Sequence, residues 1–352
     1  MRSQKEYMDI YTDYLISCQG QATATGLSSI LDELSHDQVT RFLKSEEFNS
    51  KILWQEVKKV LRDVESKDGV LIFDDTIQEK KWTKENEIIS WYYDHKIGKA
   101  VKGVNILNCL YYNNGISIPV GFEVIKKDVY YCDIQTKQEK RKSSKTKNEL
   151  MREMFRQAIK NHIKFKYVLM DSWFASKDNF EYITKKKKHF ISAIKSNRLF
   201  ATSLENKLQG KFERVDKIDK ADEKPILGYI KGYEKPVLLY RQIFKNKDGS
   251  KGIIHLVCSD TTLDKNQITT IYQKRWKVEE YHKSLKHNVN LGKSPTKIVR
   301  TQLNHIFLSI LSFFKLETLK IKYALNHFAL KAKLLIKANM IAFQELQSLK
   351  GA

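Results

Sequence analysis

The chain of 352 residues is 41% hydrophobic and 11% aromatic, so it is long and apolar enough to fold around a large core, and intrinsic disorder is excluded. Its 63 Lys and Arg residues against 41 Asp and Glu residues give a formal net charge of +22, which favours a nucleic-acid partner. No apolar run approaches the roughly 20 residues of a membrane span, and the N-terminus has no apolar signal region, so we expect a cytoplasmic protein without a membrane partner. The four cysteines have no paired spacing and argue against a zinc module or a disulfide framework: Cys18, Cys109, Cys132 and Cys258.

Residues 1–66 are expected to form a helical N-terminal region that binds DNA. Short helices are predicted over residues 25–34 and 38–44, joined by a turn in which Ser35 and Asp37 are both suitable N-caps, and a third helix over residues 50–64. The spacing of the first pair fits a helix-turn-helix that contacts DNA through Arg41 and Lys44. Simple packing of two helices is the alternative.

Residues 67–198 are expected to form the first part of an α/β core. Strands are predicted over residues 70–73, 104–112, 116–125, 167–170 and 190–195, and helices over 148–162 and 177–187. Asn113-Asn114-Gly115 is a hairpin turn, and the basic stretch 137–147 is predicted to be a mobile loop. This order of elements indicates a mixed sheet flanked by helices, with acidic residues at strand ends.

Residues 199–262 are expected to be an all-β insertion, and the core resumes in residues 263–316. Strands of the insertion are predicted over residues 212–218, 236–244 and 252–258, with a turn at residues 247–250 between the last two. Long amphipathic helices are predicted over residues 301–320 and 322–349. The C-terminal region 317–352 is expected to serve either dimerisation or core packing.

A helix without Pro or Gly is predicted over residues 266–286. At roughly 100° per residue, its side chains Tyr272, Arg275, Glu279 and Lys286 fall within an arc of about 60°. A solvated face held by salt bridges explains this arrangement. A carboxylate placed among phosphate-binding cations is the alternative. His282 on the same helix is expected to be a surface residue rather than a ligand.

Carboxylates at two strand ends suggest a metal site. Asp75, with Asp74 before it, and Asp171 each follow an apolar strand, and Glu279 is the third candidate. Carboxylates gathered by a sheet repel one another, and their hard oxygens suit Mg²⁺ or Mn²⁺. Two such ions about 3.5–4 Å apart can activate a water or a 3′-hydroxyl against a phosphodiester. An Asp at the end of a strand, taken alone, is more often a turn former or a helix cap. His95 is expected to have a structural or solvent-facing role, with a place near the acids as the alternative.

Three motifs together resemble bacterial insertion-sequence transposases of the DDE class, of the insertion-sequence-four type. They are Phe73-Asp74-Asp75-Thr76, Val168-Leu169-Met170-Asp171-Ser172-Trp173-Phe174, and the spaced signature Tyr272-x2-Arg275-x3-Glu279-x6-Lys286 with Trp276 beside the Arg. The resemblance implies an RNase H-like core in which Asp75, Asp171 and Glu279 are catalytic and hold two Mg²⁺ ions, with Mn²⁺ as a substitute. Asp75 is preferred to Asp74 because the acid directly before Thr matches the family.

The same resemblance implies cut-and-paste transposition of an insertion sequence. Tyr272, Arg275 and Lys286 would hold the phosphates of the transposon end. Trp276 is a candidate for a further DNA contact, with packing as the alternative. Relatives nick one strand, form a hairpin on the transposon end, reopen it and join the end to target DNA. Relatives can stack a flipped base on a Trp of the β insertion. This insertion has none, and its candidate substitutes are Tyr229, Tyr233 and Tyr240.

The expected partners are double-stranded DNA, namely the terminal inverted repeats and the target, and a second copy of the chain in a synaptic homodimer. The expected location is the bacterial cytoplasm, in association with the nucleoid. Two alternatives share the basic charge. One is an RNase H-like structure-specific DNA nuclease or domesticated, non-mobile relative, and the other is a DNA-binding protein whose carboxylates never assemble.

Overall fold

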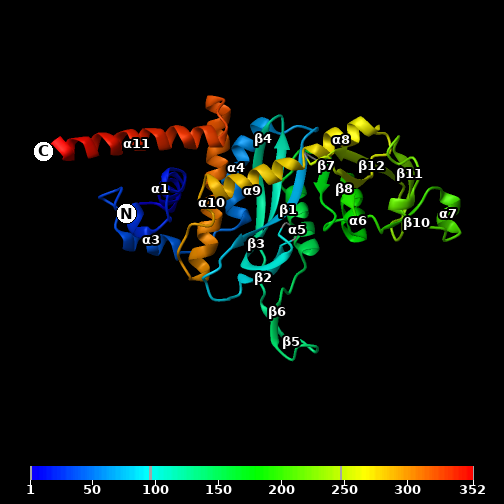
Figure 1. Ribbon diagram of the computed structural model, residues 1–352, viewed down its shortest axis with the longest axis horizontal. Coiled ribbons are helices and arrows are strands. Elements are labelled where there is room, and N and C mark those ends of the chain that lie inside the picture. Colours follow the sequence, from blue (N-terminus) through cyan, green and yellow to red (C-terminus); the bar gives the residue numbers. More distant parts are fainter. Residues whose placement is uncertain (1, 95–96, 246–247, 352) are drawn as a thin grey trace.

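The structure is a computed structural model and describes residues 2–94, 97–245 and 248–351. The N-terminal helices and the last two helices lie at one end of the molecule, the central sheet in the middle, and the late β region at the other end (Figure 1). His95 and the first residue of the predicted turn at 247–250 lie outside the described residues. No helix in the described part of the chain has the length and apolar character needed to cross a bilayer.

The N-terminal region is helical, as predicted, with helices α1 (Gln4–Ser17), α2 (Ala24–Ser28), α3 (His36–Leu43) and α4 (Ser50–Val64). Ser35 is confirmed as the N-cap of α3, where its hydroxyl accepts from Gln38 N. The prediction of a helix through residue 34 is wrong, because α2 ends at Ser28. The hydroxyls of Ser28 and Ser29 both donate to the carbonyl of Thr25, and such local bonds compete with helix continuation.

Five strands form the core sheet in the order β4-β3-β1-β7-β8. They are β1 (Val70–Glu79), β3 (Lys99–Asn113), β4 (Ile116–Val124), β7 (Tyr167–Met170) and β8 (His189–Ile194). Strand β3 is antiparallel to its neighbours β1 and β4, whereas β1, β7 and β8 are mutually parallel. The parallel strands are joined through helices α5 (Lys147–Lys160) and α6 (Lys177–Lys185). The mixed sheet flanked by helices is confirmed, and its strand order is that of an RNase H-like fold.

The turn between β3 and β4 shows how local sequence sets this sheet. Asn114 and Gly115 have φ values of 45° and 83°, the left-handed pair that a two-residue hairpin turn requires. Strand β2 (Ile89–Asp94) pairs with the first part of β3 and completes this edge. Residues 70–73 are fully buried, as expected for a strand covered on both faces.

The late β region continues the core sheet. It contains β9 (Leu199–Ala201), α7 (Leu204–Leu208), β10 (Glu213–Arg214), β11 (Ile226–Ile230), β12 (Val237–Lys245) and β13 (Lys251–Cys258). Strand β13 pairs antiparallel with β8, so the sheet runs on without a break through β13, β12 and β11.

The prediction of a strand over residues 212–218 is wrong beyond its first residues, because a 3-10 turn at Val215–Lys217 follows β10. The guanidinium of Arg241 donates to the carbonyls of Val215, Asp216 and Ile218 and holds the backbone in that turn.

The single helix predicted over residues 266–286 is two helices, α8 (Lys265–Gln273) and α9 (Trp276–His287). At the break, Lys277 N and Val278 N donate to carbonyls three residues back, on Lys274 and Arg275, so the chain tightens into a 3-10 turn. Helix α10 (Val299–Tyr323) is buried along most of its length and packs on α1 and β4. Helix α11 (His327–Gly351) projects away from the body (Figure 1).

The stretch predicted as a mobile loop over residues 137–147 is partly regular. Strand β6 (Glu139–Lys142) pairs antiparallel with β5 (Val129–Cys132), and Lys147 begins α5. Residues 129–142 therefore form a two-stranded hairpin, called here the hairpin arm, which projects from the body (Figure 1). The loop prediction is wrong because the tyrosine-containing strand β5 supplies a cross-strand partner for the basic residues.

Candidate active site

A cavity of about 390 Å³, called here the acidic cavity, lies where β1, β2, β3, the end of β7, the start of α5 and helix α9 meet. Its lining residues are Asp74, Asp75, Thr76, Ile77, Tyr92, Tyr93, Asp94, Asn105, Lys147, Asp171, Trp173, Arg275, Glu279, His282 and Lys286. It thus unites the predicted acids Asp75 and Asp171 with Glu279 and with two cations of the spaced signature, although more than 200 residues separate Asp75 from Glu279 in the chain.

Strand register brings the first acids together. Phe73 on β1 is in register with Met170 on the parallel strand β7, so Asp74 and Asp171 follow at neighbouring positions. Strand β7 ends there, but the prediction that the first strand ends at residue 73 is wrong, because β1 continues to pair with β3 as far as Glu79. Asp74 is only 9% exposed, and its Oδ2 lies 3.4 Å from Arg275 Nη1. The same guanidinium nitrogen lies 3.9 Å from Glu279 Oε1. Arg275 is therefore placed between an acid of the sheet and the acid of α9.

Asp75 has different partners, because successive residues of a strand point to opposite faces. Its Oδ2 accepts hydrogen bonds from Lys147 Nζ at 2.7 Å and from Asn105 Nδ2 at 2.8 Å. Lys147 comes from the first turn of α5, just after the hairpin arm. Each of the two adjacent acids is thus held by its own cation, Arg275 for Asp74 and Lys147 for Asp75.

The electrostatics of the cavity are those of crowded carboxylates. Burial, and then the negative charge of Asp171, raise the pKa of Asp74 to about 8, against the opposing effect of Arg275. Burial also raises the pKa of Asp171, while backbone hydrogen bonds from Trp173 and the charge of Arg275 oppose this rise. Ionising all of these acids together therefore requires additional positive charge.

The donors fit a hard divalent cation in kind. They are carboxylate oxygens, and the buried Oδ1 of Asn105, beside Asp75, has no hydrogen-bond partner in the described part of the chain. Among the described residues, no three His, Cys, Asp or Glu side chains are grouped as a metal site. Arg275 and Lys147 provide the positive charge between the acids in this arrangement.

The spaced signature divides between two hollows. Arg275, Glu279 and Lys286 line the acidic cavity, and Lys286 Nζ donates to the carbonyl of Ile77 at 3.1 Å. Tyr272 is 7% exposed, its hydroxyl donates to the carbonyl of Met170 at 3.5 Å, and it lines the adjoining hollow instead. The 3-10 turn at residues 274–275 accompanies this separation of Tyr272 from the other three.

The other predicted DNA contacts lie away from the acidic cavity. Trp276 is 62% exposed at the start of α9 and is not part of the cavity lining. Arg41 and Lys44 are exposed at the end of α3, among the N-terminal helices (Figure 1). The structure thus brings together Asp75, Asp171 and Glu279, but not these three side chains.

Sequence reasoning missed several residues of the cavity. Lys147 lay in the basic stretch expected to be a loop, and Asn105 carried no motif. Trp173, two residues after Asp171, is 56% exposed at the cavity, and Lys195 Nζ lies 5.4 Å from its ring centroid. His282 was expected at the surface but is buried and hydrogen-bonded to Asn108. Its position one helical turn after Glu279 was the available signal.

The aromatic residues of the late β region differ in their accessibility. Tyr233 is only 2% exposed, between Phe180 and Phe190, and its hydroxyl donates to Thr184. A buried ring offers no face for a base, so the expectation for Tyr233 is wrong. Lys207 Nζ lies 4.8 Å from the ring centroid of Tyr229.

Comparisons with known proteins give a family and a structural similarity. A family model described as a DDE superfamily endonuclease matches residues 1–211, which include Asp74, Asp75 and Asp171, whereas Glu279 lies beyond the match. Among solved structures, the chain is similar to one described as the Drosophila P element transposase strand transfer complex, with 10% identity and a TM-score of 0.27. That similarity covers 53% of this chain and 36% of the other. No curated protein matches the sequence.

Proposed function

The chain belongs to the DDE superfamily endonucleases, and from this premise we propose that it is a cut-and-paste DNA transposase of an insertion sequence. The observation that carries the proposal is the convergence of Asp75, Asp171 and Glu279 with Arg275 and Lys286 on one cavity of a chain with a net charge of +22. Acids alone would suit many hydrolases. The flanking cations suit a polyanionic substrate crossing the acids.

Each group in the acidic cavity then has a role. Asp75, Asp171 and Glu279 would hold the divalent ions that enzymes of this superfamily use, in our proposal two Mg²⁺ ions for which Mn²⁺ can substitute. Such ions, when bound, supply Lewis-acid activation of a water or a 3′-hydroxyl.

The cations act on the substrate. Arg275 and Lys286 bind phosphates of the transposon end and orient the scissile phosphodiester, and Tyr272 buttresses Arg275 from the adjoining hollow. The N-terminal helices, through Arg41 and Lys44, and the exposed Trp276 would contact DNA farther from the cavity. Two copies acting in the cytoplasm on nucleoid DNA would pair the two ends.

A hairpin intermediate requires a platform for a displaced base. We infer that Trp173 is this platform, because it is half-exposed, lines the acidic cavity and follows Asp171 by two residues. An exposed aromatic ring stacks any base with little sequence preference. Tyr229 and Tyr240 are the secondary candidates.

The test uses purified protein, DNA carrying the ends of its own element, and Mg²⁺. Wild-type protein should nick the ends and join them to a second DNA. Asp171→Asn and Glu279→Gln should lose both activities by about 10³-fold or more while retaining DNA binding. The matched control is Glu280→Gln on the same helix, whose carboxylate pairs with Lys277 at 2.8 Å and does not line the cavity.

The outcomes separate the candidates. Nicking without strand transfer would favour the alternative of a structure-specific nuclease or a domesticated, non-mobile relative. Cleavage by Asp171→Asn at the wild-type rate would refute the site.

A further inference from the structure

The hairpin arm is a two-stranded sheet that is separate from the core sheet. Strands β5 and β6 pair with each other and, within the described residues, with no other strand. An isolated two-stranded hairpin is marginally stable in water. This one is closed at its tip by Asp133, which accepts from Thr136 N at 2.8 Å and from Lys140 Nζ at 2.8 Å. The arm is therefore built to keep its shape while exposed.

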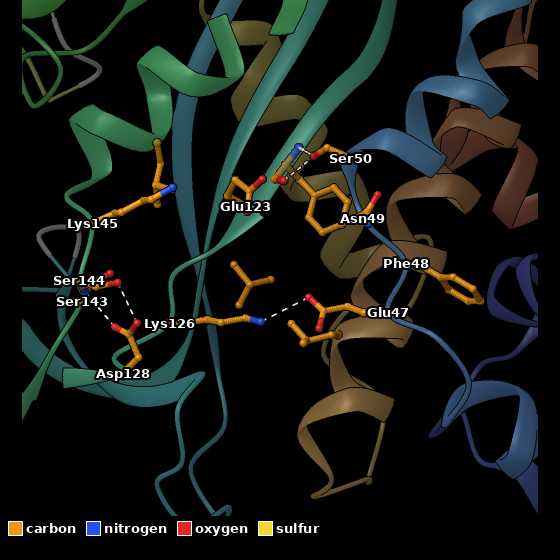
Figure 2. Close-up of a pocket in the computed structure, with 14 residues that line it drawn as sticks. Glu47, Phe48, Asn49, Ser50, Glu123, Lys126, Asp128, Ser143, Ser144 and Lys145 are labelled. Carbon is orange, nitrogen blue, oxygen red and sulfur yellow. Dashed lines mark hydrogen bonds and ion pairs between the residues drawn. The ribbon is translucent and has the colours of Figure 1, made fainter. Parts of the chain in front are cut away.

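The base of the arm is fixed to the body. The Asp128 carboxylate accepts from both the backbone nitrogen and the hydroxyl of Ser144, at 2.8 and 2.7 Å, and ties the two ends of the arm together (Figure 2). These residues form one wall of a second cavity of about 260 Å³. On a neighbouring wall, Lys126 pairs with Glu47 at 3.3 Å, which links the base to the N-terminal region (Figure 2).

The same base adjoins the acidic cavity on both sides. Before the arm, Lys127 Nζ donates to the carbonyl of Trp91 at 2.8 Å and lies 4.4 Å from the ring centroid of Tyr92, which lines the cavity. After the arm, Lys147 Nζ contacts Asp75. A substrate held in the acidic cavity would therefore run close to the arm.

The side chains of the arm suit a polyanion. Residues 129–142 contain four Lys and Arg residues and two carboxylates, of which Asp133 is engaged with Lys140 at the tip. Arg141 lies 4.7 Å from the ring centroid of Tyr130, and Lys142 Nζ lies 5.4 Å from that of Tyr131. Both rings are exposed, at 56% and 38%. The stacked cations are thereby held at the surface, where they can reach phosphates.

We propose that the hairpin arm binds duplex DNA beside the acidic cavity, through phosphate contacts of Lys137, Arg141 and Lys142. The proposal rests on the proposed function for its substrate. A two-stranded β-ribbon fits the major groove of DNA, and the excess of basic residues matches phosphates better than it matches an apolar protein surface. An apolar protein partner could contact Ile134, which is 93% exposed at the tip, but the basic residues of the arm would have no counterpart on such a surface.

The test compares two triple charge reversals. The arm variant is Lys137→Glu with Arg141→Glu and Lys142→Glu, and leaves Asp133 and Lys140 in place. The matched control is Lys185→Glu with Lys186→Glu and Lys187→Glu, which makes the same change of charge at exposed positions at the end of α6. Binding to a labelled duplex of arbitrary sequence is measured across a series of salt concentrations, together with the unfolding temperature and the oligomeric state.

We expect the arm variant, and not the control, to bind the duplex at least about tenfold more weakly at low salt. The slope of log K against log salt concentration should become shallower by about two to three, which is about 0.9 for each lost phosphate contact. Its unfolding temperature should equal that of the wild type. Equal losses in the two variants would overturn the proposal, because they would report net charge only. A changed oligomeric state with unchanged DNA binding would overturn it too, and would assign the arm to a second copy.

Failure of the arm proposal is distinguishable from failure of the proposed function. Cleavage by the wild type with arm-independent binding refutes only the arm. Arm-dependent binding with no cleavage by the wild type refutes the transposase and leaves the arm proposal standing.

Discussion

The acidic cavity and the hairpin arm are adjacent, and both contain charged side chains, but these side chains are mostly buried in the cavity and exposed on the arm. In the cavity, Asp74 is buried and Arg275 is partly buried, and both are placed by strand register and helix packing. On the arm, the cations are stacked on exposed tyrosines and supported by one turn. Lys147 joins the two regions, since it follows the arm and contacts Asp75.

The difference separates what each cluster can do. Buried charges interact strongly and are costly to leave unpaired, so each change in the cavity should alter activity, stability or both. Exposed charges are screened and contribute little to folding, so changes on the arm should appear in salt-dependent binding. The following predictions test this division, in order of expected effect.

The largest effect should distinguish the two adjacent acids. Asp75→Asn should abolish cleavage, by about 10³-fold or more, whereas Asp74→Asn should reduce it by less than about tenfold. Asp74 is buried, and its Oδ2 lies 3.4 Å from Arg275 Nη1, so it is suited to positioning Arg275. Cleavage rates of both variants with end-containing DNA and Mg²⁺ provide the measurement.

The same experiment can reverse the assignment. If Asp74→Asn proves as inactive as Asp75→Asn, both acids hold ions and the positioning role is refuted. If Asp74→Asn alone is inactive, Asp74 replaces Asp75 as the ligand.

A smaller effect should appear in stability. The pKa of Asp74 is raised from 3.8 to about 8 on folding, so the folded protein binds more protons than the unfolded chain between these values. Its contribution to stability is therefore lost as pH rises through this window. In the absence of divalent ions, the unfolding free energy of Asp74→Asn should therefore fall less than that of the wild type between pH 5 and pH 8, because the variant lacks the titrating carboxyl group.

Asp37→Asn is the control, because this carboxylate is exposed at the start of α3. Urea unfolding at each pH gives the free energies. Parallel curves for wild type and Asp74→Asn would show that Asp74 ionises normally in the folded protein.

Much of the fold was readable from local sequence. Apolar runs marked β1 and β7, Asn114 and Gly115 set a hairpin turn, and Ser35 set a helix start. One error occurred where a distant side chain determines the backbone conformation. Arg241 holds residues 215–218 in a turn by hydrogen bonds that no local pattern contains.

The candidate site was predictable to a similar depth. The motif acids identified the side of the acidic cavity that the sheet forms, because an acid after an apolar run is a local pattern. The spacing of Arg275, Glu279 and Lys286 identified the side that α9 forms, because helix periodicity is local too. Lys147 and Asn105 were missed, since their approach to Asp75 depends on how α5 and β3 pack around β1. The break between α8 and α9, which separates Tyr272 from the other signature residues, was likewise not encoded by Pro or Gly.

The smallest effect is predicted for the turn of the hairpin arm, at Asp133→Ala. Hydrogen bonding to Lys140, and then to Thr136, holds the pKa of Asp133 well below its usual range, so its carboxylate is charged and engaged throughout the neutral range. Removing it should loosen the arm while leaving the unfolding temperature unchanged, because β5 and β6 pair only with each other within the described chain. Amide hydrogen exchange should accelerate at Thr136, whose N–H loses its carboxylate acceptor, and at Lys137 in the same turn, and should stay slow in β1 and β7. A lowered unfolding temperature would show instead that the arm is coupled to the core through Lys147 and Asp75, which would remove the division between the two clusters.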